Sequence, residues 1–86
     1  MTSVDVYTKD DCAYCMMTKT ALAKHAVQFN EYKLHRDFSK EHIQEKFPGA
    51  KSFPIIVVDG FFIGGYNQLS SYLEEQTRSA KTLLNE

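Results

Sequence analysis

Hydrophobic and polar residues alternate in the first segment of the chain. Val4 and Val6 stand between polar neighbours in residues 3–8, which are rich in β-branched and aromatic side chains. This period of two predicts a half-buried strand, and the polar residues 9–11 predict a loop after it. In residues 13–25 apolar side chains instead recur every three or four positions, with no glycine or proline. That spacing predicts an amphipathic helix.

Two further elements are expected before the middle of the chain. Residues 27–35 alternate again, with one change of phase near Asn30, and this predicts a second strand that frays or bulges in its middle. Ser39 is a suitable N-cap, and Ile43 and Phe47 form an apolar i, i+4 pair before a Pro-Gly pair. These residues predict a short second helix.

Two strongly β-prone runs follow, residues 55–58 and 61–63, separated by Asp59-Gly60. An Asp-Gly pair between such runs is a strong signal for a tight hairpin. We therefore expect adjacent antiparallel strands in the middle of the core. After a glycine pair, Asn67 can cap a last helix of about two to three turns, judged from the helical spacing of its apolar residues.

The predicted order of elements is βαβαββα, in an α/β domain. A chain of 86 residues is shorter than the roughly 100 to 200 residues typical of each domain, so we expect a single domain over residues 1–86. Its core should span about residues 3–76, and residues 77–86 form a polar tail that frays or extends the last helix. A parallel strand pair joined by a helix favours a four-stranded mixed sheet with helices on its faces.

Charge and composition exclude some classes of function but do not identify one. Ten basic and eleven acidic residues give a net charge of -1, which offers no electrostatic basis for binding nucleic acid or an anionic membrane. The sequence has no long apolar run and no signal-peptide pattern at its start. We therefore expect a cytoplasmic protein.

The chemistry of the sequence is concentrated in its only two cysteines, Cys12 and Cys15. They follow a predicted strand and open a predicted helix, where unpaired N–H groups and the helix dipole favour a thiolate. The positive charge of Lys9 further favours the thiolate, whereas the negative charges of Asp10 and Asp11 disfavour it. The pair is therefore expected to be redox-active, with Cys12 at the helix terminus as the more reactive thiol.

Metal binding and a purely structural role are the alternatives for the two cysteines. A structural zinc site needs two further ligands at close spacing. The three histidines, His25, His35 and His42, are isolated in polar segments and are interpreted as surface residues. Thiols in the cytosol are kept reduced, which disfavours a structural disulfide. Because the further zinc ligands are lacking as well, redox use is favoured over metal binding or an idle pair.

Three separated motifs, "KDDCAYC", "SFP" and "GGYNQL", resemble those of the glutaredoxins, and the resemblance extends from Val4 to about Glu75. It implies a thioredoxin-like fold, in which a four-stranded mixed sheet is flanked by three helices. It also implies that Cys12 is the nucleophile and Cys15 the resolving thiol. Glutathione would be the co-substrate, with no obligatory metal.

The resemblance further implies a binding groove for glutathione. Lys9 would contact the glycine carboxylate, Pro54 would be cis, and the glycine pair would let the γ-glutamyl carboxylate reach a helix N-terminus. The residues expected to bind glutathione are Lys9, Tyr14, Lys51, Phe53, Pro54, Gly65, Tyr66, Asn67 and Gln68.

The chain departs from the family pattern at several positions. Ala13 stands where dithiol relatives most often have proline, which changes the turn between the cysteines and should change the reduction potential. Ser52 replaces a threonine before the Phe-Pro pair. Asn67 and Gln68 replace the acidic pattern of many relatives, so an amide rather than a carboxylate would accept from the glutamyl amine.

From this resemblance we expect a monomeric glutathione-dependent oxidoreductase that reduces protein disulfides and glutathione mixed disulfides. Its partners would be glutathione and disulfide-bearing or glutathionylated proteins, with ribonucleotide reductase as a candidate acceptor. One alternative is a [2Fe–2S] carrier, in which Cys12 from two chains and two glutathiones hold the cluster. Another is a glutaredoxin-like electron donor that receives its electrons from thioredoxin reductase.

Overall fold

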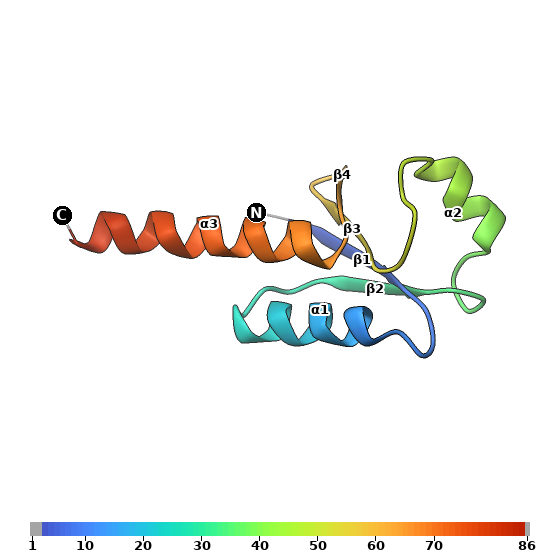
Figure 1. Cartoon of the computed structure of the whole chain (residues 1–86), viewed down its shortest axis with the longest axis horizontal. Helices are drawn as coiled ribbons and strands as arrows, with labels where there is room; N and C mark the ends of the chain where they lie inside the picture. The colour runs from blue at the N-terminus through green and yellow to red at the C-terminus, as the bar shows by residue number, and fades with distance from the viewer. Residues whose placement is uncertain (1–2, 86) are drawn as a thin grey trace.

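The first half of the chain forms a parallel strand pair connected by a helix. The computed structural model describes the backbone of residues 3–85 and the side chains of residues 3–75. Strand β1 (Val4–Thr8) leads into α1 (Ala13–Lys24), and the chain returns as β2 (Asn30–Lys33), parallel to β1. The β1–α1 junction, where the cysteines lie, is therefore at one end of the sheet (Figure 1).

The second half adds a short helix, a hairpin and a long helix. Helix α2 (Lys40–Lys46) is followed by β3 (Ile55–Val58), β4 (Phe61–Gly64) and α3 (Tyr66–Asn85). The strand order is β2-β1-β3-β4, and β3 runs antiparallel to both of its neighbours. The expected βαβαββα order and four-stranded mixed sheet are confirmed.

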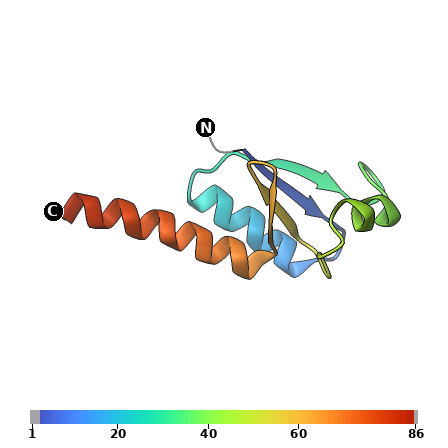
Figure 2. The same cartoon turned by 90° about the horizontal axis from the view of Figure 1, so that it is seen from above.

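The sheet separates two hydrophobic clusters. On one face α1 and α3 lie side by side (Figures 1 and 2) and pack with the strands around Val4, Val6, Leu22, Ile56, Val58, Leu69 and Leu73. On the other face the cluster of Tyr7, Ile43, Ile55 and Val57 is completed by α2 and the segment after it. Residues of β1 and β3 therefore contribute to both faces, and in β3 they alternate between them, as a pleated sheet requires.

The second strand is shorter than expected. Before it, the N–H of Val27 bonds to the carbonyl of Leu22 and closes α1, with Ala26 at a positive φ of 57°. After it, the N–H groups of Arg36 and Asp37 both bond to the carbonyl of Lys33 and form a turn. The alternating pattern on either side of β2 therefore lies outside the strand, although Val27 and Phe29, which precede it, still pack on the core.

The hairpin strands differ in their positions. Strand β3 is an inner strand and is buried along its whole length, but β4 is an edge strand. The ring of Phe61, at the start of β4, is 73% exposed. The expectation that both strands lie in the middle of the core was therefore right for β3 and wrong for β4.

The last helix is longer than expected and begins differently. Asn67 lies inside α3 and does not cap it; instead the side-chain carbonyl of Gln68 accepts a hydrogen bond from the N–H of Gly65, at 2.9 Å. This is one half of a capping box. Helix α3 continues to Asn85, so residues 77–85 extend it. Within the described residues no helix is long and apolar enough to cross a membrane.

Candidate active site

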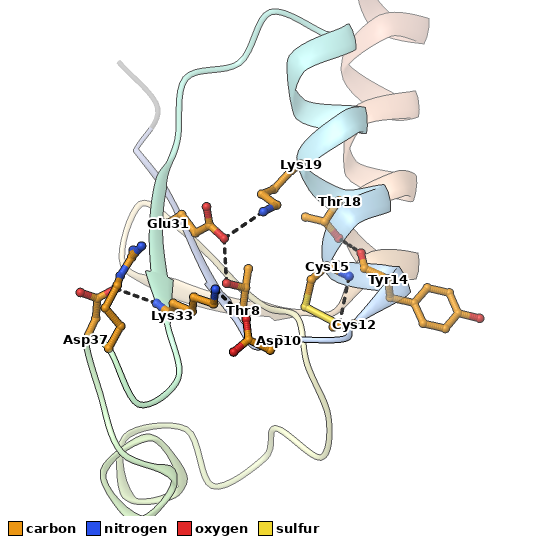
Figure 3. A network of polar contacts seen from close by, with 11 residues as sticks. Thr8, Asp10, Cys12, Tyr14, Cys15, Thr18, Lys19, Glu31, Lys33 and Asp37 are labelled. Carbon is orange, nitrogen blue, oxygen red and sulfur yellow. Dashed lines mark hydrogen bonds and ion pairs between the residues drawn. A yellow bond between two sulfur atoms is a disulfide. The ribbon is translucent and has the colours of Figure 1, made fainter.

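The two cysteines occupy the junction of β1 and α1 and are joined in a disulfide (Figure 3). Cys12 is the N-cap of α1, and its Sγ accepts a hydrogen bond from the N–H of Cys15, at 3.1 Å. Cys12 is half-buried, whereas Cys15 is only 2% exposed. Of the two sulfur atoms, that of Cys12 is the one that a substrate can approach more easily.

A cis peptide bond between Phe53 and Pro54 faces the cysteines. The resemblance predicted this bond, and the structure confirms it. The carbonyl oxygen of Phe53 lies 3.9 Å from the Sγ of Cys12, and Pro54 is buried just before β3. The loop before β3 thus lines the approach to the reactive sulfur.

A groove of about 470 Å³ runs from this loop to the start of α3. It contains every residue expected to bind glutathione except Lys9, namely Tyr14, Lys51, Phe53, Pro54, Gly65, Tyr66, Asn67 and Gln68. The ring centroids of Tyr14 and Tyr66 lie 5.9 Å apart, and the two rings form part of one wall. Side chains from three distant parts of the sequence therefore meet in one groove.

The lining of the groove differs from the expectation at Lys9 and at Phe62. Lys9 lies in a neighbouring hollow, which it shares with Lys51 and Phe53. Phe62, on the edge strand, lines the groove, and its ring is 5.7 Å from that of Phe47. The alternating pattern of β4 gave no sign of this role, because it depends on which strand lies at the edge of the sheet.

The glycine pair lets the backbone come close to the groove. Gly64 has a φ of 129°, which side-chain-bearing residues rarely adopt. A Cβ atom on Gly65 would lie 3.3 Å from the carbonyl oxygen of Pro54, which is closer than an ordinary van der Waals contact. Each glycine therefore has a structural requirement of its own.

The first turn of α3 supplies a potential carboxylate site. The N–H groups of a first helical turn have no partner within the helix, and the positive end of the dipole lies there. In α3 these groups belong to Tyr66, Asn67 and Gln68, all of which line the groove. The groove can thus hold an anionic peptide-like molecule beside Cys12.

One of the two acidic residues before the cysteines, Asp10, is held in an ion pair. Asp10 forms an ion pair with Lys33 at 2.6 Å (Figure 3). The hydrogen bond and the charge of Lys33 lower the pKa of the Asp10 carboxyl group. The negative charge of Asp10 is therefore compensated from β2, which reduces its opposition to a Cys12 thiolate.

A partly buried polar network lies between β1, β2 and α1 (Figure 3). Thr8 donates to Glu31 at 2.8 Å, and the ammonium of Lys19 lies 3.1 Å from the same carboxylate oxygen. Burial alone would raise the pKa of Glu31, but the bonds from Thr8 and Lys19 outweigh it and lower the pKa. This network was not predicted from the sequence, because its members come from three separate elements.

The histidines lie outside the groove. His25, His35 and His42 are exposed and do not line it. Among the residues that the structure describes, no group of three or more His, Cys, Asp or Glu side chains could hold a metal ion. A cluster bridged by Cys12 from two chains remains a prediction.

Comparisons with known proteins agree with this geometry. The family model described as Glutaredoxin matches residues 4–63. Glutaredoxin 3 of Escherichia coli K12 is 33% identical over 69 residues, which is 80% of this chain and 83% of the relative. The glutaredoxin-like protein NrdH of Lactococcus lactis subsp. cremoris is also 33% identical, over 64 residues, 73% of this chain and 86% of the relative.

The fold is also found among solved structures. The structure of reduced Escherichia coli glutaredoxin superposes with a TM-score of 0.74, covering 88% of this chain and 98% of that one, at 23% identity. At this identity the likeness shows the fold alone, which is thioredoxin-like.

Proposed function

The chain belongs to the glutaredoxin family of thiol-disulfide oxidoreductases, and from this premise we propose that it reduces protein disulfides and glutathione mixed disulfides with electrons from glutathione. The observation that carries the proposal is the groove. It joins the loop at the half-buried Cys12 to the first turn of α3, and so offers a sulfur and a carboxylate site to one small peptide.

The proposed reaction is a sequence of two exchanges. The Cys12 thiolate attacks one sulfur of the substrate disulfide, so that a mixed disulfide forms and the other sulfur leaves as a thiolate. Cys15, after losing its proton, attacks the Sγ of Cys12 and releases the second substrate thiolate. Two electrons have then passed to the substrate, and the chain holds the Cys12–Cys15 disulfide.

Glutathione would restore the dithiol. One glutathione thiolate attacks the Sγ of Cys12, forms a mixed disulfide there and displaces Cys15 as a thiolate. A second glutathione thiolate attacks the glutathione sulfur of this mixed disulfide, so that Cys12 leaves as a thiolate and glutathione disulfide is released. We propose that the first turn of α3 binds the γ-glutamyl carboxylate, while the Phe53 backbone pairs with the tripeptide as an added strand. Lys51 and the neighbouring Lys9 would attract its glycine carboxylate.

Two cysteine variants test these roles. Cys12→Ser should abolish turnover in an assay coupled to glutathione and glutathione reductase, because no thiolate remains to begin the exchange. Cys15→Ser should still reduce a glutathione mixed disulfide, since a second glutathione can release the product, but should lose most reduction of an intramolecular protein disulfide. Substantial turnover by Cys12→Ser would contradict the assignment.

A second candidate reductant is thioredoxin reductase. It is favoured by one specific observation, the 33% identity to a glutaredoxin-like protein NrdH. In this alternative Cys12 and Cys15 would keep their roles, and ribonucleotide reductase would be a candidate acceptor. Lys51 and the carboxylate site at α3 support glutathione instead, because they form an anion-binding groove that a protein reductant does not need.

A further inference from the structure

A second hollow lies beside the groove, and the proposed reaction does not fully use it. Its volume is about 280 Å³. Three lysines from separate segments line it: Lys9 from the loop after β1, Lys40 from the start of α2, and Lys51 from the loop before β3. We call this hollow the lysine pocket.

The other lining residues of the lysine pocket are mainly apolar. They include Ile43 and Ile55, which are each only 3% exposed, together with Phe47 and Phe53. The pocket therefore combines a hydrophobic lining with a cationic one. A ligand that fits it needs an apolar group and a negative charge close together.

The charges of the three lysines are not compensated by ion pairs within the described residues. All three side chains are exposed, and the ion pairs of that part of the chain involve Lys19, Lys33 and Arg36 instead. Asp10, the acidic residue next to Lys9, is paired with Lys33. The positive charge around the pocket is therefore available to a partner.

The lysine pocket is directly connected to the reactive sulfur. Lys51 and Phe53 line both the pocket and the groove, and the carbonyl oxygen of Phe53 lies 3.9 Å from the Sγ of Cys12. A polypeptide whose disulfide is in contact with Cys12 can thus reach the pocket with residues close to its own cysteine.

We propose that the lysine pocket recognises the protein substrate, by binding an acidic segment that places an apolar side chain and at least one carboxylate next to the target disulfide. The inference rests on the proposed function and adds the class of substrate. Glutathione has carboxylates but no apolar side chain for Ile43 and Ile55 to contact. Its reduction should therefore depend little on Lys40, which does not line the groove.

Two disulfide peptides and two charge reversals test the proposal. The peptides share one intramolecular disulfide and differ only in the residues beside it, Leu-Glu-Glu in one and Leu-Lys-Lys in the other. Lys40→Glu places a negative charge on the pocket, at a helix start that tolerates it. Lys24→Glu, an exposed lysine at the far end of α1, makes the same change in net charge and is the matched control.

The wild type should reduce the acidic peptide with a kcat/KM about tenfold above that of the basic peptide, the preference expected when a few surface charge pairs act together. Lys40→Glu should lower that preference at least threefold, Lys24→Glu should leave it unchanged, and added salt should weaken it. All three proteins should still reduce a small glutathione mixed disulfide, which shows that their cysteines remain active.

Equal rates for the two peptides in the wild type would overturn the proposal that the lysine pocket recognises the protein substrate. An equal loss of the preference for the acidic peptide in Lys40→Glu and Lys24→Glu would overturn it as well. Failure of the wild type to reduce even the small glutathione mixed disulfide would instead contradict the proposed function. The two failures are therefore distinguishable in one set of assays.

Discussion

At the scale of single residues, the groove depends on the absence of a side chain at Gly65. Gly65→Ala would place a Cβ atom 3.3 Å from the carbonyl oxygen of Pro54, so the loop and the start of α3 must move apart. We expect the KM for glutathione to rise about tenfold, a loss of about 1.4 kcal/mol of binding energy. Steady-state kinetics with varied glutathione measure this.

Gly60→Ala is the matched control for Gly65→Ala. Gly60 has a φ of 85°, and nothing lies within 4 Å of the added Cβ atom. This variant should lose about 1 kcal/mol of stability to urea, because its backbone conformation is strained, with an unchanged KM for glutathione. A KM that stays unchanged in Gly65→Ala would contradict the close approach of the two backbones.

The Thr8–Glu31–Lys19 network gives a pH-dependent prediction. The pKa of Glu31 is lowered in the folded chain, so its ionised form stabilises the fold above its unfolded pKa, and this contribution is lost as the pH falls through the folded pKa. Glu31→Gln should cost about 1 kcal/mol at pH 7. The deficit should shrink once the pH falls below the ordinary glutamate pKa of about 4.3.

Urea denaturation of the wild type and Glu31→Gln across the acid range measures this deficit. Glu45→Gln is the control, since Glu45 is exposed and forms no ion pair within the described residues. A deficit for Glu31→Gln that is constant with pH would show that the carboxylate charge contributes nothing.

Residue types and short motifs predicted most of the residues that meet in the groove, but not the hydrogen bonds and ion pairs formed around it. The glycine pair and the Phe-Pro pair place the groove because they constrain the backbone locally. The ion pair between Asp10 and Lys33 depends on where β2 packs beside the loop after β1, and no spacing rule in the sequence contains that information. The hydrogen bond from Gly65 to Gln68 is local and has the i, i+3 spacing of a capping box, so the sequence did carry a signal for it, although the cap was assigned to Asn67.

At the scale of elements, α2 provides a simple test of capping. The Oγ of Ser39 accepts a hydrogen bond from the N–H of His42, at 3.2 Å. Ser39→Ala should lower the free energy of unfolding by about 1 kcal/mol, as measured in urea. Ser71→Ala, at an exposed position inside α3, should cost nothing; an equal loss in both variants would show that the Ser39 cap is not the cause.

The order and type of every element followed from hydrophobic periodicity, whereas several boundaries did not. Strand β2 ends where the turn at Lys33 begins, and this turn is set by backbone hydrogen bonds that alternation cannot reveal. The edge position of β4 likewise depends on the strand order. Periodicity records which side chains face a core, and it does not record which strand has a neighbour on both sides.

At the scale of the whole molecule, the two faces of the sheet pack against helices that line two different hollows. One face packs against α1, which carries Cys12 at its start, and α3, whose first turn lines the groove. The other face packs against α2, which contributes Lys40 to the lysine pocket. The groove and the lysine pocket therefore lie side by side at the end of the sheet where the cysteines lie. A reductant and a protein substrate can both contact the molecule there.

The central claim, that glutathione supplies the electrons, is tested most directly by one comparison of reductants. Turnover of a protein disulfide is measured with glutathione and glutathione reductase, and separately with thioredoxin reductase, each coupled to NADPH oxidation. We predict fast turnover with glutathione and little with thioredoxin reductase, because the groove ends at the first turn of α3, whose N–H groups can bind a carboxylate. Efficient turnover with thioredoxin reductase, and none with glutathione, would contradict the claim.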